Sequence, residues 1–211
     1  MENGTNVKAG STKTERSFEL IGGHPALDLV NTLDWRFRES GSEEFINNYG
    51  DVVRFIEQSG MIGPVEARRL LRGAPENKAE KIVVAIRELR EAMAEVLYAA
   101  VAGKNPPGSS VKELEACLNE ARGQQQLRWE GGKLAWTLPQ PYSVAAPFWL
   151  LALSAGQFIA SDQMQMLRDC GNDECRWLFL DTSRNHTRRW CDMKICGNRM
   201  KARRFKAQHR G

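Results

Sequence analysis

The chain has 211 residues, of which 42% are hydrophobic and 27% charged, and its net charge is +4. This length and composition predict a soluble protein with one sizeable core and a small appendage, or with two modest domains. They argue against a membrane protein, because the longest apolar run, residues 144–155, is shorter than the roughly 18–20 residues that span a bilayer.

The basic residues concentrate at one end of the chain. Residues 168–211 carry 12 Lys/Arg and 5 Asp/Glu, a net charge of +7, whereas the rest of the chain carries a net charge of −3. A basic end on a mildly acidic body indicates contact with a polyanion, and a solvated charged helix is the alternative.

The first residues, 1–16, contain almost no apolar side chains, and we expect them to form a disordered leader. They do not have the pattern of a secretory signal, so we expect a cytoplasmic location. Thiols stay reduced in that compartment, and paired cysteines there hold metals more often than they form disulfides.

Residues 17–161 predict a mostly helical α+β domain with small strand elements. Residues 18–21 have the pattern of a short strand that ends at a Gly-Gly turn. Residues 26–33 follow as a short helix with Pro25 in its first turn.

Two short helices come next. The first is capped by Asp51 and ended by Gly60, and the second begins at Pro64 and ends at Gly73. The longest helix is expected over residues 79–102, where one face carries an apolar stripe made of Ile82, Ile86, Leu89, Met93 and Leu97.

A further helix is expected behind a capping box formed by Ser110 and Glu113, with Cys117 on its buried face. A β-hairpin follows, in which Gly131-Gly132 is the turn and two Trp–Leu pairs lie on one side: Trp129 with Leu134, and Leu127 with Trp136. Residues 143–160 are apolar on most sides and predict a central buried helix.

Four of the five cysteines lie in residues 162–211, as two pairs with four residues inside each pair and fifteen between the pairs. The first pair, Cys170 and Cys175, fits the tip of a β-hairpin. If Asp192 caps the terminal helix, Cys191 precedes that helix and Cys196 lies in its first two turns, so both thiols can converge on the tip. We therefore expect a C-terminal ββα-type module built around a four-cysteine site.

Four thiolates satisfy tetrahedral Zn²⁺ and leave no position for a catalytic water, so the site is expected to be structural. An iron–sulfur cluster is the rival interpretation, because it also uses four cysteines. Two disulfides are disfavoured by the compartment.

The terminal segment also presents a cationic stripe, because Arg199, Arg203, Lys206 and Arg210 recur at steps of four, three and four. Three arginines in the preceding loop, Arg184, Arg188 and Arg189, are candidates for phosphate contacts. A zinc-anchored helix with such a stripe predicts nucleic-acid binding.

The segment around Cys196-Gly197-Asn198-Arg199 resembles the CGNR zinc finger, and residues 22–33, GGHPALDLVNTL, resemble the opening motif of the ABATE domain that precedes this finger. The resemblance covers nearly everything from Phe18 onward. It implies a zinc-binding, stress-related transcription regulator with metal ligands Cys170, Cys175, Cys191 and Cys196.

Within the ABATE-like motif, His24, Asp28 and Asn31 are candidates for lining a small-ligand pocket. The alternative, which we favour, is that Asp28 and Asn31 hydrogen-bond the neighbouring backbone and hold the fold together. No second histidine or cysteine lies nearby to form a nucleophile–base pair, so we expect no enzyme.

We therefore expect a transcription regulator that binds duplex DNA, with the body sensing a small-molecule effector or forming a homodimer. An RNA- or ribosome-associated module using the same surface would prefer single strands or structured RNA. A thiol-based redox or zinc sensor would lose its metal on oxidation.

Overall fold

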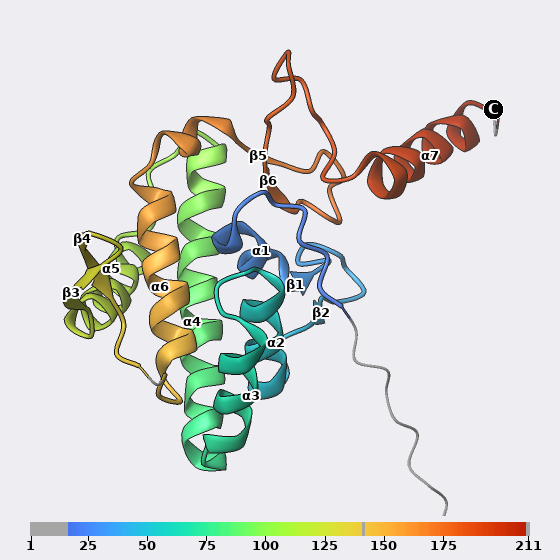
Figure 1. Ribbon diagram of the computed structural model, residues 1–211. Helices are drawn as coiled ribbons and strands as arrows, with labels where there is room; N and C mark the ends of the chain where they lie inside the picture. The colour runs from blue at the N-terminus through green and yellow to red at the C-terminus, as the bar shows by residue number, and fades with distance from the viewer. Residues whose placement is uncertain (1–16, 141, 210–211) are drawn as a thin grey trace, which may run out of the picture.

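The computed structural model describes residues 17–140 and 142–209 (Figure 1). The expected leader, residues 1–16, lies outside the described residues. Helices make up most of the described chain, with three separate two-stranded antiparallel sheets and a C-terminal cysteine cluster. The α+β class is confirmed. None of the described helices is both long enough and apolar enough to cross a membrane.

Six helices form the body, and α4, α5 and α6 pack against one another while α1 packs against α4 and α6 (Figure 1). Their bounds are α1 Pro25–Asn31, α2 Tyr49–Gln58, α3 Pro64–Gly73, α4 Glu76–Val101, α5 Gly108–Gly123 and α6 Ala146–Ile159. The long helix was predicted correctly, although α4 begins three residues before the expected start. The predicted helix over residues 143–160 is α6.

The body core follows the predicted apolar faces. Four members of the predicted stripe, Ile86, Leu89, Met93 and Leu97, are buried, and Ile82 packs on their margin. Cys117 lies in the same core, as expected. Burial raises the pKa of its thiol to about 11, which makes it an inert core residue.

The predicted strand over residues 18–21 was wrong, because this segment is irregular. Its backbone is held by side chains rather than by a neighbouring strand: Phe18 N–H donates to Gln58 Oε1 (2.9 Å), and Gly22 N–H donates to Asp28 Oδ1 (2.7 Å). The apolar side chains Phe18 and Leu20 still pack on the body core, which explains the strand-like pattern.

Two predicted helix caps were also wrong. Asn48 is the N-cap of α2, and Asp51 sits three residues later, where its carboxylate closes a capping box. In α5, Pro107 occupies the N-cap position without a side-chain hydrogen bond. The hydroxyl of Ser110 instead donates to Glu95 on α4, so a tertiary contact displaces the expected local one.

The predicted hairpin is present with its predicted register. Strands β3 (Gln126–Glu130) and β4 (Lys133–Thr137) pair Trp129 with Leu134 and Leu127 with Trp136. The turn glycines Gly131 and Gly132 have φ values of +56° and +84°, the left-handed region that a two-residue hairpin turn requires. A second small sheet pairs β1 (Leu33–Asp34) with β2 (Glu43–Glu44).

The C-terminal segment, which we call the finger (residues 162–209), contains four kinds of element. The finger opens with a 3₁₀ turn, η1 (Asp162–Met166). Strands β5 (Leu167–Asp169) and β6 (Leu178–Leu180) then form a hairpin. The five-residue π-helix η2 (Met193–Gly197) leads into α7 (Asn198–Gln208), which projects away from the body (Figure 1).

The finger shares the body core. Leu178 and Leu180 of β6 belong to the body core, whereas Trp177 and Phe179, which alternate with them, pack in the cysteine cluster. Strand β6 therefore contributes side chains to both clusters, one cluster on each of its faces. The boundary expected after residue 161 stays a prediction, but the two parts pack as one unit at this strand.

Candidate metal centre and cationic surface

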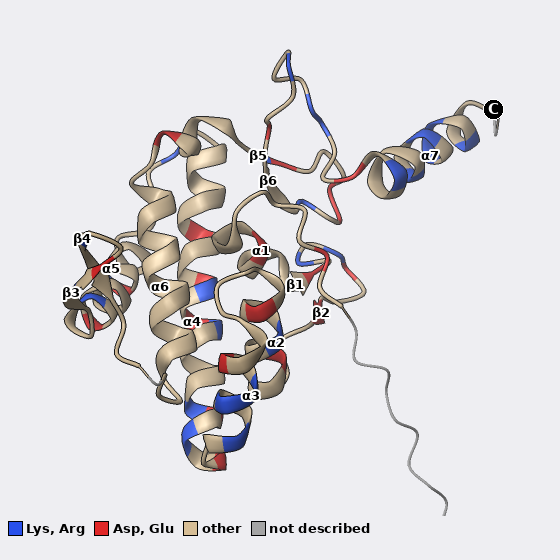
Figure 2. Ribbon diagram, in the orientation of Figure 1, with Lys and Arg blue, Asp and Glu red and all other residues tan. Residues whose placement is uncertain are grey.

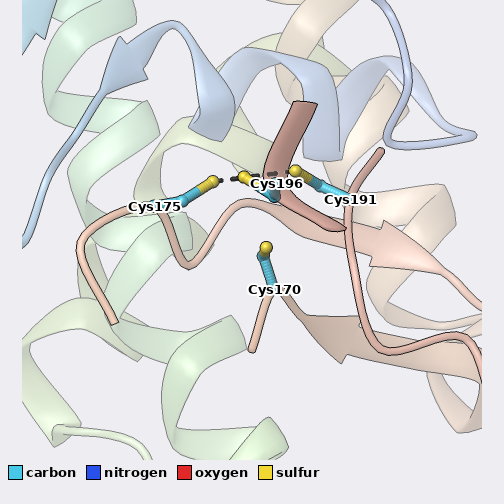
Figure 3. Close-up of side chains that lie close together, drawn as sticks. All are labelled: Cys170, Cys175, Cys191 and Cys196. Atoms are coloured by element: carbon cyan, nitrogen blue, oxygen red, sulfur yellow. Dashed lines mark hydrogen bonds between the residues drawn. The ribbon is translucent and has the colours of Figure 1, made fainter. Parts of the chain in front are cut away.

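Four cysteine thiols converge in the finger (Figure 3). The Sγ atoms of Cys170, Cys175, Cys191 and Cys196 all lie within 4.8 Å of one another, and all four residues are buried. The Sγ atoms of Cys175 and Cys191 are 3.7 Å apart. Tetrahedral zinc with Zn–S bonds of about 2.3 Å separates its sulfurs by about 3.8 Å, so the thiol set fits this ion in number, chemistry and spacing.

The first pair of thiols is placed by the tip of the β5–β6 hairpin. Cys170 N–H donates to Trp177 O (2.9 Å), which extends the ladder by one bond. Inside the tip, Asn172 O accepts from Cys175 N–H (2.9 Å) and from Arg176 N–H (3.0 Å), and Arg176 has φ +49°. This tight turn brings Cys175 back toward Cys170, as the sequence predicted.

The second pair is placed by the start of the terminal helix. Asp192 is the N-cap, as predicted, and its carboxylate accepts from Lys194 N–H (2.6 Å) and Ile195 N–H (3.0 Å). Gly197 N–H donates to Asp192 O (3.1 Å), which closes one π-helical turn. Cys191 therefore precedes the turn and Cys196 lies inside it, and both face the hairpin tip.

Gly197 follows Cys196 in the Cys-Gly-Asn-Arg tetrapeptide and permits close packing there. A Cβ at this position would lie 2.4 Å from Met193 Sδ and 3.2 Å from Trp190 Cδ1. The site is completed by Asn172, which is 0% exposed and directs its Nδ2 toward Cys196 Sγ (3.7 Å). An amide donor of this kind stabilises a thiolate.

The thiols influence one another's protonation. A hydrogen bond from Cys175, with further ones from Cys191 and Cys196, lowers the pKa of Cys170 far below its usual range. The same contacts, led by that with Cys170, raise the pKa of Cys175. Metals bind thiolates and not thiols, so metal binding at this cluster would release protons.

The candidate nucleic-acid residues of the loop differ in their surroundings. Arg188 is half-buried over the ring of Phe179 (4.3 Å), and its guanidinium donates to Trp190 O (3.0 Å), Leu180 O (3.4 Å) and Cys191 O. Its hydrogen-bonding capacity is therefore used inside the finger. Arg189 is exposed beside Trp190, and Arg184 is exposed without a contact in the described chain.

The predicted stripe on α7 begins with two residues that contact the rest of the molecule. Arg199 lies over the ring of Trp35 (4.5 Å), and Arg203 Nη2 forms an exposed ion pair with Glu174 Oε1 (2.9 Å). Lys206 is exposed with no partner among the described residues. Arg210 lies outside the described residues.

Two further basic residues, Lys201 and Arg204, are exposed on the other side of α7 and make no contact in the described chain. They were not predicted, because the predicted stripe follows one helical face and these two residues lie on another. None of the α7 residues is buried, so the charge of this helix surrounds it (Figure 2).

The three candidate pocket residues of the body are not brought together. Only His24 lines the cavity of about 860 Å³ that lies between α6 and the β3–β4 hairpin. Its ring packs on Phe158 (4.9 Å), its Nδ1 accepts from Ala26 N–H (3.2 Å), and burial lowers its pKa. It is therefore a neutral imidazole that caps α1.

Asp28 and Asn31 hold the backbone, which was the alternative favoured from the sequence. Asn31 Nδ2 donates to Leu178 O and Asn31 Oδ1 accepts from Leu178 N–H, both at 2.9 Å, so its amide pairs with β6 of the finger. Asp28 accepts from Gly22 N–H, and Gly22 O in turn accepts from Leu180 N–H (2.9 Å). Neither side chain lines the cavity.

Other contacts between body and finger had no signal in the sequence. Trp177 Nε1 donates to Asp34 Oδ1 (2.8 Å), and Tyr98 OH donates to Arg176 O (2.9 Å). The guanidinium of Arg176 lies over the rings of Phe37 (4.5 Å) and Tyr98 (5.3 Å), which contact each other edge to face. These pairs are distant in the chain, and only the fold brings them together.

Two family models match the chain. Residues 23–162 match ABATE, described as "Putative stress-induced transcription regulator", and residues 166–209 match the CGNR zinc finger. Among curated proteins, none matches the chain.

Proposed function

Because the chain belongs to the ABATE family and ends in a CGNR zinc finger, we propose that it is a zinc-binding transcription regulator that contacts duplex DNA through α7. The family description points to a regulator and not to an enzyme. The observation that carries the proposal is the exposed cationic helix that leaves the cysteine cluster.

The four thiols support a structural zinc ion. They supply all four ligands of a tetrahedral site, and all four are buried. Among the described residues, no further His, Cys, Asp or Glu belongs to this cluster. The ion would therefore fix the direction of α7, because Cys196 lies in the turn that opens this helix.

The shape and charge of α7 support DNA as the ligand. Its 11 residues include no acidic side chain and five basic ones, which are Arg199, Lys201, Arg203, Arg204 and Lys206. Such a helix is about 16 Å long and fits a major groove about 12 Å wide. Because none of its residues is buried, a groove could surround it on several sides.

We assign the basic residues of α7 to two roles according to their contacts. Arg199 and Arg203 would hold the helix against Trp35 and Glu174, while Lys201, Arg204 and Lys206 would contact phosphates. The exposed loop residues Arg184 and Arg189 would add further phosphate contacts. Arg188 is left out of this set, since its guanidinium is used inside the finger.

The body would supply sensing or dimerisation. Its cavity of about 860 Å³ has the size of small-molecule sites. The lining mixes one histidine with amide, hydroxyl and charged side chains, among them Gln125, Gln157, Ser154 and Arg128, so we propose a polar effector.

Binding of the zinc-loaded chain to duplex DNA, single-stranded DNA and RNA across a salt series tests the proposal. We expect preference for duplex DNA and affinity that falls steeply with salt. Lys201→Ala/Arg204→Ala should lower the magnitude of the salt slope by about 2, because each lost phosphate contact removes about 0.9. Zinc content should stay unchanged.

Arg68→Ala/Arg69→Ala on α3 is the matched control, since it removes the same charge from exposed positions of the body. Equal loss in both variants would show that only overall charge matters and would contradict the proposed surface. Preference for RNA would identify an RNA-binding module instead. Absence of binding at low salt would refute nucleic-acid binding by α7.

A further inference from the structure

The β3–β4 hairpin exposes its apolar face. The two cross-strand pairs lie on one side of it, and the exposed fractions are 71% for Trp129, 58% for Leu134, 50% for Leu127 and 65% for Trp136. Exposure of two neighbouring tryptophans to this degree is unusual for a protein surface.

The opposite face of the same hairpin is turned toward the body. Arg128, Glu130 and Thr137 line the cavity beside α6, and Ala135 and Thr137 are half-buried. Trp136 contributes to that lining as well, yet it stays mostly exposed. The polar side of the hairpin therefore borders the cavity, while its apolar side is left uncovered, the reverse of a sheet that packs on its own core.

A two-stranded hairpin is marginally stable in water unless further strands or a helix cover its apolar face. Within the described residues, β3 and β4 pair only with each other. The hairpin is therefore expected to be stable only when its apolar face is covered by a group that lies outside the described residues.

We propose that the hairpin is a homodimer interface, in which the apolar face of one copy packs on the same face of a second copy. The four side chains form a self-complementary set. Trp129 and Trp136 lie on one diagonal of the face, and Leu127 and Leu134 lie on the other.

A two-fold axis in the plane of this face, either along or across the strands, places each tryptophan over a leucine of the second copy. Pairing of a large side chain with a smaller one across the contact permits close packing. An isologous contact of this kind is the commonest way in which identical chains associate.

The area and charge of the face also fit a second copy. A buried aromatic side chain covers roughly 150–250 Å². With the exposed fractions above, two such faces together remove on the order of 1,000 Å² from water, the least that a specific interface needs. The face carries no charged side chain, so two positively charged chains can meet there without placing like charges opposite each other.

The position of the hairpin leaves the finger accessible. The hairpin and α7 lie at opposite sides of the molecule (Figure 1). Dimerisation is therefore separable from nucleic-acid binding, and each can fail without the other.

Sedimentation velocity of the full zinc-loaded chain without nucleic acid, from about 1 to about 100 µM, tests the proposal. We expect a concentration-dependent dimer. Trp129→Thr/Trp136→Thr should raise the dimer dissociation constant by at least about 100-fold, because buried tryptophans dominate such contacts. Threonine keeps the strand propensity of both positions.

Val84→Thr/Val111→Thr is the control, because it removes two exposed apolar side chains from α4 and α5 and should leave the dimer intact. Far-ultraviolet circular dichroism and zinc content establish that each variant is folded. A wild type that stays monomeric at about 100 µM would overturn the proposal. So would a tryptophan variant that dimerises as strongly as the wild type.

Single-stranded DNA is the other occupant that an exposed tryptophan pair can stack against. Quenching of tryptophan fluorescence by an oligonucleotide, lost in Trp129→Thr/Trp136→Thr and accompanied by a monomeric wild type, would assign the face to nucleic acid and refute the dimer.

Discussion

The body and the finger are stabilised in different ways although they share strand β6. The body core is a cluster of 33 buried residues in the described chain, drawn mostly from its helices and from β5 and β6. The finger cluster has six buried residues, four of which are the cysteines. The body is held by the burial of apolar surface, whereas the finger has too few apolar residues to fold in that way.

The comparison shows how a small module can be rigid without a core of its own. Metal–thiolate bonds at the four cysteines would replace the missing apolar contacts, and alternate residues of β6 attach the module to the larger core. We therefore expect the stability of the body to depend on the metal, which would not hold for two modules joined by a linker.

Zinc removal is the perturbation with the largest expected effect. Structural zinc contributes about 10–16 kcal/mol to the folding of small modules, so chelation should unfold the finger. Because Leu167, Leu178 and Leu180 then lose their fixed positions, the melting temperature of the body should fall by at least about 5 °C. Calorimetry with metal analysis checks this, and we expect one zinc and no iron per chain.

Two controls apply. Added zinc should restore the melting temperature of the chelated protein. Cys117→Ala should leave the zinc content unchanged, because Cys117 lies in the body core. An identical melting temperature with and without metal would mean that the two regions fold independently.

Asn31→Ala should have the next largest effect, because it removes the two hydrogen bonds between α1 and β6 and leaves the metal site and both cores in place. It leaves Leu178 N–H and Leu178 O buried without partners, which costs about 2–4 kcal/mol. Urea unfolding measures this loss. Asn47→Ala, at an exposed amide bonded to Glu44 O (3.0 Å), should cost under about 1 kcal/mol. An equal loss of unfolding free energy in the two variants would show that the Asn31 amide does not help to hold the finger on the body.

Substitution of Asp28 should have the smallest effect on the free energy of unfolding, and this effect should depend on pH. Burial raises its pKa from 3.8 to about 6, partly opposed by the backbone N–H groups of Gly22 and Ile21. The folded state therefore holds the proton more tightly than the unfolded state. The stability that this provides is complete below pH 3.8 and is lost as pH rises through about 6.

Asp28→Asn keeps an acceptor for Gly22 N–H and removes the charge. At pH 7.5 the variant should be about 1–3 kcal/mol more stable than the wild type, and below pH 4 the two should differ little. Urea unfolding at both pH values measures the difference. If the difference in unfolding free energy between variant and wild type is the same at both pH values, the pKa of Asp28 is not raised by folding.

The cysteine site could be predicted from the sequence because its determinants are local. The spacing of Cys170 and Cys175, together with Asp192 before the last thiol, fixes two short turns that can close on one ion. The helices of the body were predictable for a similar reason, since each presents a continuous apolar face, as Leu89 and Met93 do on α4.

Two of the failures came where a distant partner replaces a local one. Ser110 bonds Glu95 instead of capping α5, and residues 18–21 are bonded to side chains instead of a strand. The ring contacts of Arg188 with Phe179 and of Arg199 with Trp35 likewise join side chains that only the fold brings together. The register of the β3–β4 hairpin was predicted correctly, but register alone does not say which face meets the body.

The amide of Asn31 also covers the free edge of strand β6. In the two-stranded sheet of the finger, β5 pairs with one side of β6, and the backbone groups of Leu178 and Leu180 point to the other side. An open strand edge of this kind recruits strands from other chains. Here Asn31 and the carbonyl of Gly22 occupy that edge, so a side chain and a loop take the place of a third strand.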